Sequence, residues 1–158
     1  MSQVKVAQET EVVQSLQTQL ANAFLLYFNY KRYHWQSYGP HFRDLHHLFD
    51  EQGGEVLATI DELGERVRIL HSTPIASPAE FTERATVIVS TGQTMKDMIE
   101  EAAQNHSTVI KELRESVEIA NRANDPGTAD LFTRIVQIHE KHEWFLRELL
   151  EKNDGLSS

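Results

Sequence analysis

The sequence contains no cysteine, few prolines and glycines, and no long apolar run. Because cysteine is absent, disulfides and thiolate metal sites are excluded, and the composition fits a cytoplasmic protein. With 4 prolines and 7 glycines among 158 residues, most of the chain is free to form helices and to bury one core. The longest purely apolar run, residues 23–28, is far shorter than the roughly 20 residues of a membrane span.

Positive charge is also scarce. Fifteen Lys and Arg residues stand against 24 Asp and Glu residues, for a net charge of -9. Phosphate contacts are made by Lys and Arg, so a large nucleic-acid footprint is disfavoured. An acidic surface suits cations, although it also serves solubility alone. The opening MSQVKVAQETEVV lacks the basic and apolar regions of a secretory signal.

Apolar residues recur at three- and four-residue steps through most of the chain, which predicts helices. We expect four long helices over about residues 10–35, 41–71, 91–121 and 128–152. Pro78 and its neighbours predict a short helix in the crossover between the second and third of these. The fold class is therefore all-α, a four-helix bundle over residues 10–152 with a flexible arm at 1–9 and a short tail at 153–158.

Histidines also occur on the predicted core faces. In the third helix the apolar stripe includes His106, which we interpret as a core histidine with a satisfied hydrogen bond. The last helix gives a stripe of Leu131, Ile135, Ile138, His142, Phe145 and Leu149. HEKHE at residues 139–143 does not match the zinc-protease pattern H-E-x-x-H. The chain has no Glu-x-x-His pair, which disfavours a di-iron site inside the bundle.

Four metal-ligand side chains share one face of the second helix. At about 100° per residue, His46, Asp50, Asp61 and Glu65 fall within roughly 100° of arc. His46 and Asp61 are nevertheless about 22 Å apart along the helix, because each residue rises about 1.5 Å. One chain cannot bring them to one metal ion.

A second copy of the helix, antiparallel across a two-fold axis, would place His46 opposite the partner's Asp61. The midpoint lies between Gly53 and Gly54, where mid-helix glycine costs roughly 1 kcal/mol each and close approach of two backbones would compensate. The sequence thus predicts an isologous dimer with two equivalent metal sites. His34, at the end of the preceding helix, can approach His46 across the short turn. Two imidazoles and two carboxylates suit Fe(II), with Zn, Mn and Co as competitors.

The runs KRYHWQSYGPHFRDLHHLFDE and IDELGERVR resemble the signature of the Dps family, the DNA-binding proteins from starved cells, also called mini-ferritins. The resemblance extends from about residue 10 to residue 150. It implies a ferritin-like subunit that forms a hollow dodecamer from two-fold dimers. It also implies ferroxidase activity, in which Fe(II) is oxidised, preferably with hydrogen peroxide, and the ferric mineral is stored inside.

By this resemblance the ferroxidase ligands are His34, His46, Asp61 and Glu65, with Asp50 as an accessory acid. Trp35 is either an interfacial hydrophobe or a trap for stray oxidising equivalents. The resemblance also places Asp125 and Asp130 in an acidic pore for ion entry, whereas carboxylates at the start of a helix are favoured by its dipole alone.

The lysine-rich terminal arm with which some Dps proteins bind DNA is missing, since the first ten residues contain only Lys5. This argues against DNA binding by the chain. The alternative is a nucleoid-associated DNA-binding protein whose metal site is structural and holds zinc. A zinc-bridged helical oligomer is a third hypothesis.

Overall fold

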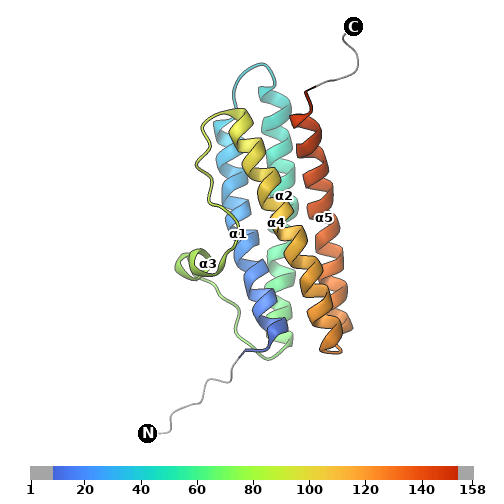
Figure 1. Cartoon of the computed structure of the whole chain (residues 1–158). Helices are drawn as coiled ribbons and strands as arrows, with labels where there is room; N and C mark the ends of the chain where they lie inside the picture. Colours follow the sequence, from blue (N-terminus) through green and yellow to red (C-terminus); the bar gives the residue numbers. More distant parts are fainter. Residues whose placement is uncertain (1–8, 153–158) are drawn as a thin grey trace.

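The computed structural model describes residues 9–152 and contains five helices there (Figure 1). The long ones are α1 (Glu11–Gln36), α2 (Phe42–Ile69), α4 (Met95–Arg122) and α5 (Pro126–Leu150), and α3 (Pro78–Arg84) is short. No strand is found in this part of the chain. None of its helices is both long and apolar enough to cross a membrane. The all-α prediction, with a short helix in the crossover, is confirmed.

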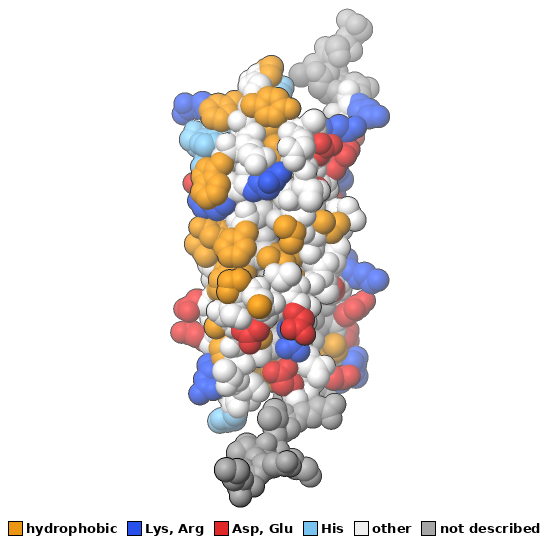
Figure 2. Space-filling view, turned by 90° about the vertical axis from the view of Figure 1, so that its left-hand side faces the viewer, with side chains coloured by type: hydrophobic (Ala, Val, Ile, Leu, Met, Phe, Trp, Pro, Cys, Tyr) orange, Lys and Arg blue, Asp and Glu red, His pale blue; other side chains and the backbone are white. Residues whose placement is uncertain are grey.

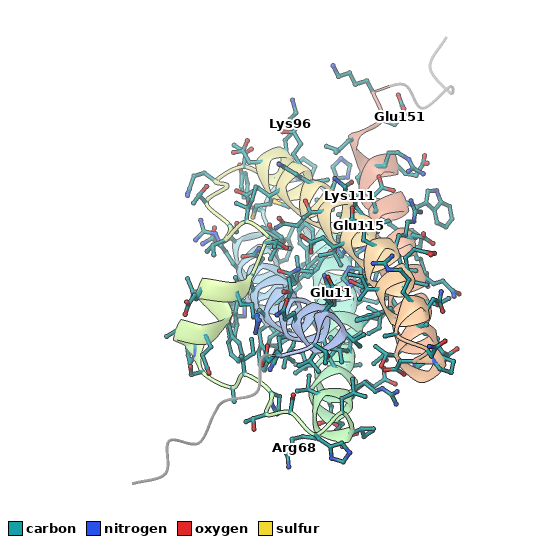
Figure 3. The ribbon with its side chains drawn as sticks, turned by 60° about the horizontal axis from the view of Figure 1, so that its bottom comes forward. Glu11, Arg68, Lys96, Lys111, Glu115 and Glu151 are labelled. Carbon is teal, nitrogen blue, oxygen red and sulfur yellow. The ribbon has the colours of Figure 1, made fainter. Side chains whose placement is uncertain are left out.

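The four long helices form two antiparallel hairpins that pack side by side. Helix α1 packs mainly on α2, and α4 mainly on α5, while the crossover carries α3 along the flank of α1 (Figure 1). In a view tilted so that the bottom of the bundle comes forward, Arg68 lies at the opposite end of the bundle from Lys96 (Figure 3). The core between the hairpins is mostly apolar, and Leu16, Phe49, Leu113 and Phe132 are completely buried.

Side-chain caps fix where the helices begin. Ser77 and Glu80 form a capping box at α3, as the sequence predicts. A second capping box joins Thr94 to Asp97, so α4 begins at Met95 and not near residue 91. Residues 91 and 92 lie outside the helix, and their backbone N–H groups donate to the carboxylate of Glu101 instead of entering α4. The predicted start of α4 was therefore too early.

The core face of α5 differs from the prediction. Leu131, Ile135 and His142 are buried as expected, but Leu149 is 45% exposed. His139 and Leu146 are buried although the predicted stripe omitted them. Positions 138 and 139 both fit a three- to four-residue repeat, and the apolar Ile138 was preferred to a histidine. The face of α5 that packs on α4 includes His139, which contacts His106.

The first described residue is not part of a free arm. The Glu9 carboxylate pairs with Arg84 at 3.2 Å and accepts a hydrogen bond from Gln17. These contacts join the start of α1 to the end of α3, so the predicted arm does not include residue 9. The rest of the predicted arm, and the predicted tail at 153–158, lie outside the described residues.

Candidate metal centre

His34 and His46 lie face to face at one end of the α1–α2 hairpin. Nδ1 of His34 donates to the carbonyl oxygen of His46 at 2.6 Å, and Nδ1 of His46 donates to the carbonyl oxygen of His34 at 2.7 Å. The rings stack with centroids 3.6 Å apart and an angle of 16° between their planes. The expected approach of His34 to His46 is therefore observed.

This reciprocal bonding fixes the tautomer of both imidazoles. A carbonyl oxygen only accepts, so each Nδ1 carries a proton, and in the neutral imidazole the lone pair is on Nε2. Within residues 9–152 neither Nε2 has a hydrogen-bond partner. Orienting a histidine through one ring nitrogen while the other stays free is how proteins prepare a metal ligand. The two side chains are thus held ready to donate to a cation.

Asp50 lies one turn beyond His46 on α2 and pairs with Lys31 of α1. The distance from Nζ to Oδ1 is 2.9 Å, and the Asp50 side chain remains half exposed. The hydrogen bond from Lys31 is the main cause that lowers the pKa of the Asp50 carboxyl, with smaller contributions from the nearby His34 and His46. Asp50 is therefore an anion beside the histidine pair.

Asp61 and Glu65 are exposed and lie on the other half of α2. They line a surface hollow of about 340 Å³ whose apolar wall includes Leu20, Phe24 and Ile60. Within residues 9–152, no three His, Cys, Asp or Glu side chains are grouped so that they could hold a metal ion. In the single chain, the predicted ligands therefore form a histidine half and a carboxylate half.

The two glycines at the middle of α2 have different surroundings. A Cβ at Gly53 would lie 2.9 Å from Cβ of Tyr30, so Gly53 lets α1 pack closely on α2 within the subunit. The hypothesis that both glycines serve a two-fold axis is wrong for Gly53, which is buried inside the hairpin. Gly54 is exposed, and a Cβ there would meet nothing within 4 Å.

The remaining predicted site residues lie on the surface. Trp35 follows His34 and is 74% exposed, which is unusual for so large an apolar side chain. Asp125 caps α5 by accepting from the Thr128 N–H at 3.0 Å and pairs with Arg66 at 2.7 Å. Asp130 is more exposed and pairs with Arg134 at 3.3 Å. Both acids at the start of α5 thus have a cationic partner.

A buried polar cluster in the middle of the bundle was only partly expected. His106 and His139 meet through their Nδ1 atoms at 2.8 Å, and the Tyr30 hydroxyl contacts Nε2 of His106. His142 contacts the Glu55 carboxylate at 2.8 Å. The prediction that His106 is a core histidine with a hydrogen-bond partner is confirmed. The occurrence of three histidines at core positions of two neighbouring helices was the available signal for the cluster.

The fold and the histidine pair place this chain in the ferritin-like class of four-helix bundles, and the comparisons agree. A family model described as a ferritin-like domain matches residues 13–155. DNA protection during starvation protein 1 of Deinococcus radiodurans is 34% identical over 89% of this chain and 69% of its own length. An uncharacterized low temperature-induced protein of Nostoc is 35% identical, over 91% of this chain and 82% of its own length.

Solved structures give the same result. Dps from Thermosynechococcus elongatus superposes with a TM-score of 0.90 at 55% identity, covering 94% of this chain and 95% of that one. Dps from Staphylococcus aureus superposes with a TM-score of 0.87 at 30% identity, covering 92% and 100%. The chain belongs to the Dps family.

Proposed function

We propose that the protein is a ferroxidase that stores iron. In this proposal it oxidises Fe(II), preferably with hydrogen peroxide, and keeps the ferric product inside a hollow dodecamer built from two-fold dimers. The observation that carries the proposal is the pair His34 and His46, whose Nδ1 atoms are bound to backbone carbonyls while both Nε2 atoms are free. A Dps structure from Vibrio cholerae, 27% identical, is described as a member of a superfamily of ferritin-like diiron-carboxylate proteins.

The two halves of the site complete each other only between subunits. His34 and His46 of one subunit would bind iron together with the partner subunit's Asp61 and Glu65, and Asp50 would assist from beside the histidines. Imidazole and carboxylate donors of mixed hardness suit Fe(II), and Zn(II) competes for the same set. The protein holds the ion with open coordination positions and brings the oxidant close to it.

The electron balance favours hydrogen peroxide as the oxidant. Two Fe(II) ions give one electron each, and one hydrogen peroxide with two protons becomes two water molecules. No hydroxyl radical is released when both electrons arrive at the same peroxide. Oxidation and storage of iron would then also remove peroxide.

The surface supports an assembly. Apolar side chains gather at the middle of the face on the α3 side of the bundle (Figure 2). Phe28, Ile88 and Val89 are large apolar residues that are each about half exposed. Exposed apolar area of this kind marks contact surfaces. An interface along α1 and α2 would also cover Trp35 and the hollow beside Asp61.

Mixed assemblies test the shared site. One variant carries His34→Ala and His46→Ala, and the other carries Asp61→Asn and Glu65→Gln. Each alone should fail to form ferric absorbance after anaerobic Fe(II) loading and addition of peroxide. A mixed dimer contains one complete site, so co-assembly at equal amounts should restore about one quarter of the wild-type sites. If the mixture stays as inactive as its parents, the shared site is ruled out.

The second candidate function is DNA protection, which the names of several relatives suggest. The net charge of -9 argues against it for this chain. A gel shift at physiological salt separates the two functions, and we expect no retardation. A structural zinc site is distinguished by the same Fe(II) and peroxide experiment, because zinc does not change its oxidation state.

A further inference from the structure

Tyr30 is a phenol enclosed in the core of the bundle. Its side chain is 1% exposed, and its hydroxyl lies 2.5 Å from Nε2 of His106 and 2.9 Å from the amide oxygen of Gln52. A hydroxyl has one proton to donate, so only one of these two neighbours receives it. When that neighbour is His106, Nδ1 of His106 carries a proton and donates to Nδ1 of His139.

The surroundings keep both Tyr30 and His106 uncharged. Burial raises the pKa of the Tyr30 phenol well above its usual value and lowers the pKa of His106 well below its usual value. His139 and His142 lower the pKa of His106 further. The Glu55 carboxylate contacts His142 and not His106. When the phenol donates to His106, a protonated phenol thus faces the Nε2 lone pair of a neutral imidazole at neutral pH. The described residues offer no metal-binding group here, so the cluster needs another explanation.

Aromatic rings connect Tyr30 with the metal centre. The Tyr30 ring lies 5.8 Å from the Tyr33 ring and 6.2 Å from the Phe49 ring, and the Tyr33 and Phe49 rings are 5.4 Å apart. Tyr33 directly precedes His34, and Phe49 directly precedes Asp50. On α1, Tyr30 is one turn before His34, or about 6 Å along the helix axis. An electron can therefore reach the site through rings in contact.

We propose that Tyr30 is a redox-active residue, which gives one electron to a one-electron oxidant formed at the metal centre while its phenol proton moves to Nε2 of His106. The inference rests on the proposed function for the source of the oxidant. The pairing of a buried phenol with a neutral imidazole acceptor does not depend on that function.

The electron of Tyr30 goes to the oxidant, and its proton goes to His106. When only one Fe(II) meets hydrogen peroxide, Fe(III), hydroxide and a hydroxyl radical are formed. The radical takes an electron from Tyr30 and a proton from solvent and becomes water, while Tyr30 becomes a neutral phenoxyl and His106 an imidazolium. An oxidised phenol is a much stronger acid than an imidazolium, so burial of His106 does not stop this transfer. A later Fe(II) returns the electron, and His106 returns the proton.

The other tyrosines are less suited to this role. The Tyr33 hydroxyl donates at 3.2 Å to a Glu101 carboxylate oxygen that also accepts from Ser90. Hydrogen bonds to Glu101 lower the pKa of its carboxyl, which makes it a weak proton acceptor. Tyr27 and Tyr38 lie nearer the surface, and neither hydroxyl has a hydrogen-bond partner within residues 9–152. Tyr30 alone combines burial with an imidazole acceptor in the described structure.

A metal-free experiment tests the couple itself. The assembled protein, stripped of metal, is oxidised by a photosensitiser with persulfate, and the tyrosyl radical is detected by electron paramagnetic resonance. We expect a long-lived neutral tyrosyl signal that Tyr30→Phe removes and the matched control Tyr27→Phe retains. His106→Asn keeps the phenol but removes the Nε2 acceptor, so it should lose most of the signal. An unchanged signal in either Tyr30→Phe or His106→Asn overturns the inference.

An iron experiment tests whether the couple is used. Under limiting Fe(II) with excess peroxide, Tyr30→Phe should release more hydroxyl radical to a spin trap than wild type or Tyr27→Phe. If wild type forms no ferric absorbance, the proposed function fails, and the metal-free result still decides the Tyr30–His106 couple. If ferric product forms but Tyr30→Phe and wild type give equal spin-trap signals, the inference is wrong while the proposed function stands.

Discussion

A methyl group at Gly53 would lie 2.9 Å from Cβ of Tyr30, closer than two carbon atoms approach without a shift. The contact joins α2 to α1 at Tyr30, which lies one turn before His34 on α1. It makes the close packing of α1 on α2 at this point depend on the absence of a side chain at position 53.

Gly53→Ala should therefore destabilise the subunit. Overpacking of a tight core contact costs about 1–3 kcal/mol, which outweighs the roughly 1 kcal/mol that Ala gains over Gly in a helix. Urea unfolding measures the difference. Gly54→Ala is the matched control, since nothing lies within 4 Å of its added Cβ, and it should not lower the stability of the isolated subunit. Equal losses in both variants would contradict the assignment of Gly53 to the α1–α2 contact.

The buried histidines predict an acid-sensitive fold. Burial lowers the pKa of His139 from 6.5 to about 3, so the unfolded chain binds a proton that the folded chain refuses. The stability from this group is complete above about pH 6.5 and is lost as the pH falls from there toward 3. At pH 5 the loss from one such histidine is about 2 kcal/mol relative to neutral pH.

His139→Gln should reduce this dependence. The variant loses a hydrogen bond at every pH, but the difference in unfolding free energy between pH 7.5 and pH 5 should shrink by about 2 kcal/mol. His41→Gln is the control, because His41 is exposed and makes no capping bond. If the two variants show the same pH dependence, the buried cluster does not control acid stability.

The acids at the start of α5 separate stability from ion entry. Asp125 and Arg66 are each about one-fifth exposed, so Asp125→Asn removes a partly buried ion pair and should cost about 1–3 kcal/mol of stability. Asp130 is 71% exposed in its side chain, and Asp130→Asn should change stability little. If both acids guide Fe(II) inward, each variant should slow iron uptake at saturating peroxide. If Asp130→Asn takes up iron at the wild-type rate, Asp130 does not guide Fe(II) and serves only in its contact with Arg134.

We propose Trp35 as a trap for stray oxidising equivalents at the surface. Its indole is 74% exposed beside His34 and cannot be explained by packing within the subunit. We expect Trp35→Phe to increase hydroxyl radical escape during peroxide turnover while anaerobic Fe(II) binding, followed by calorimetry, stays at the wild-type level. An unchanged radical yield would leave Trp35 as an interfacial hydrophobe.

Much of the fold was encoded locally. Apolar repeats located the four long helices, because a helix that packs on one face has apolar residues at every third or fourth position. Pro78 with Glu80 located the crossover helix. The start of α4 was missed because it depends on Glu101, which holds residues 91 and 92 from nine or ten positions away. The α5 stripe was misjudged at His139 because a buried histidine is recognised only through its partners.

The sequence by itself determined that four of the predicted metal ligands share one face of α2 and that a straight helix keeps His46 and Asp61 apart. Only the tertiary structure decided which atoms of the histidines are free, because the tautomer depends on carbonyl oxygens supplied by the neighbouring helix. It also decided that Gly53 serves the α1–α2 contact and that Tyr30, His106 and His139 meet. Such contacts join residues far apart in the chain, so they depend on how the helices pack and cannot be read from the period of any single helix.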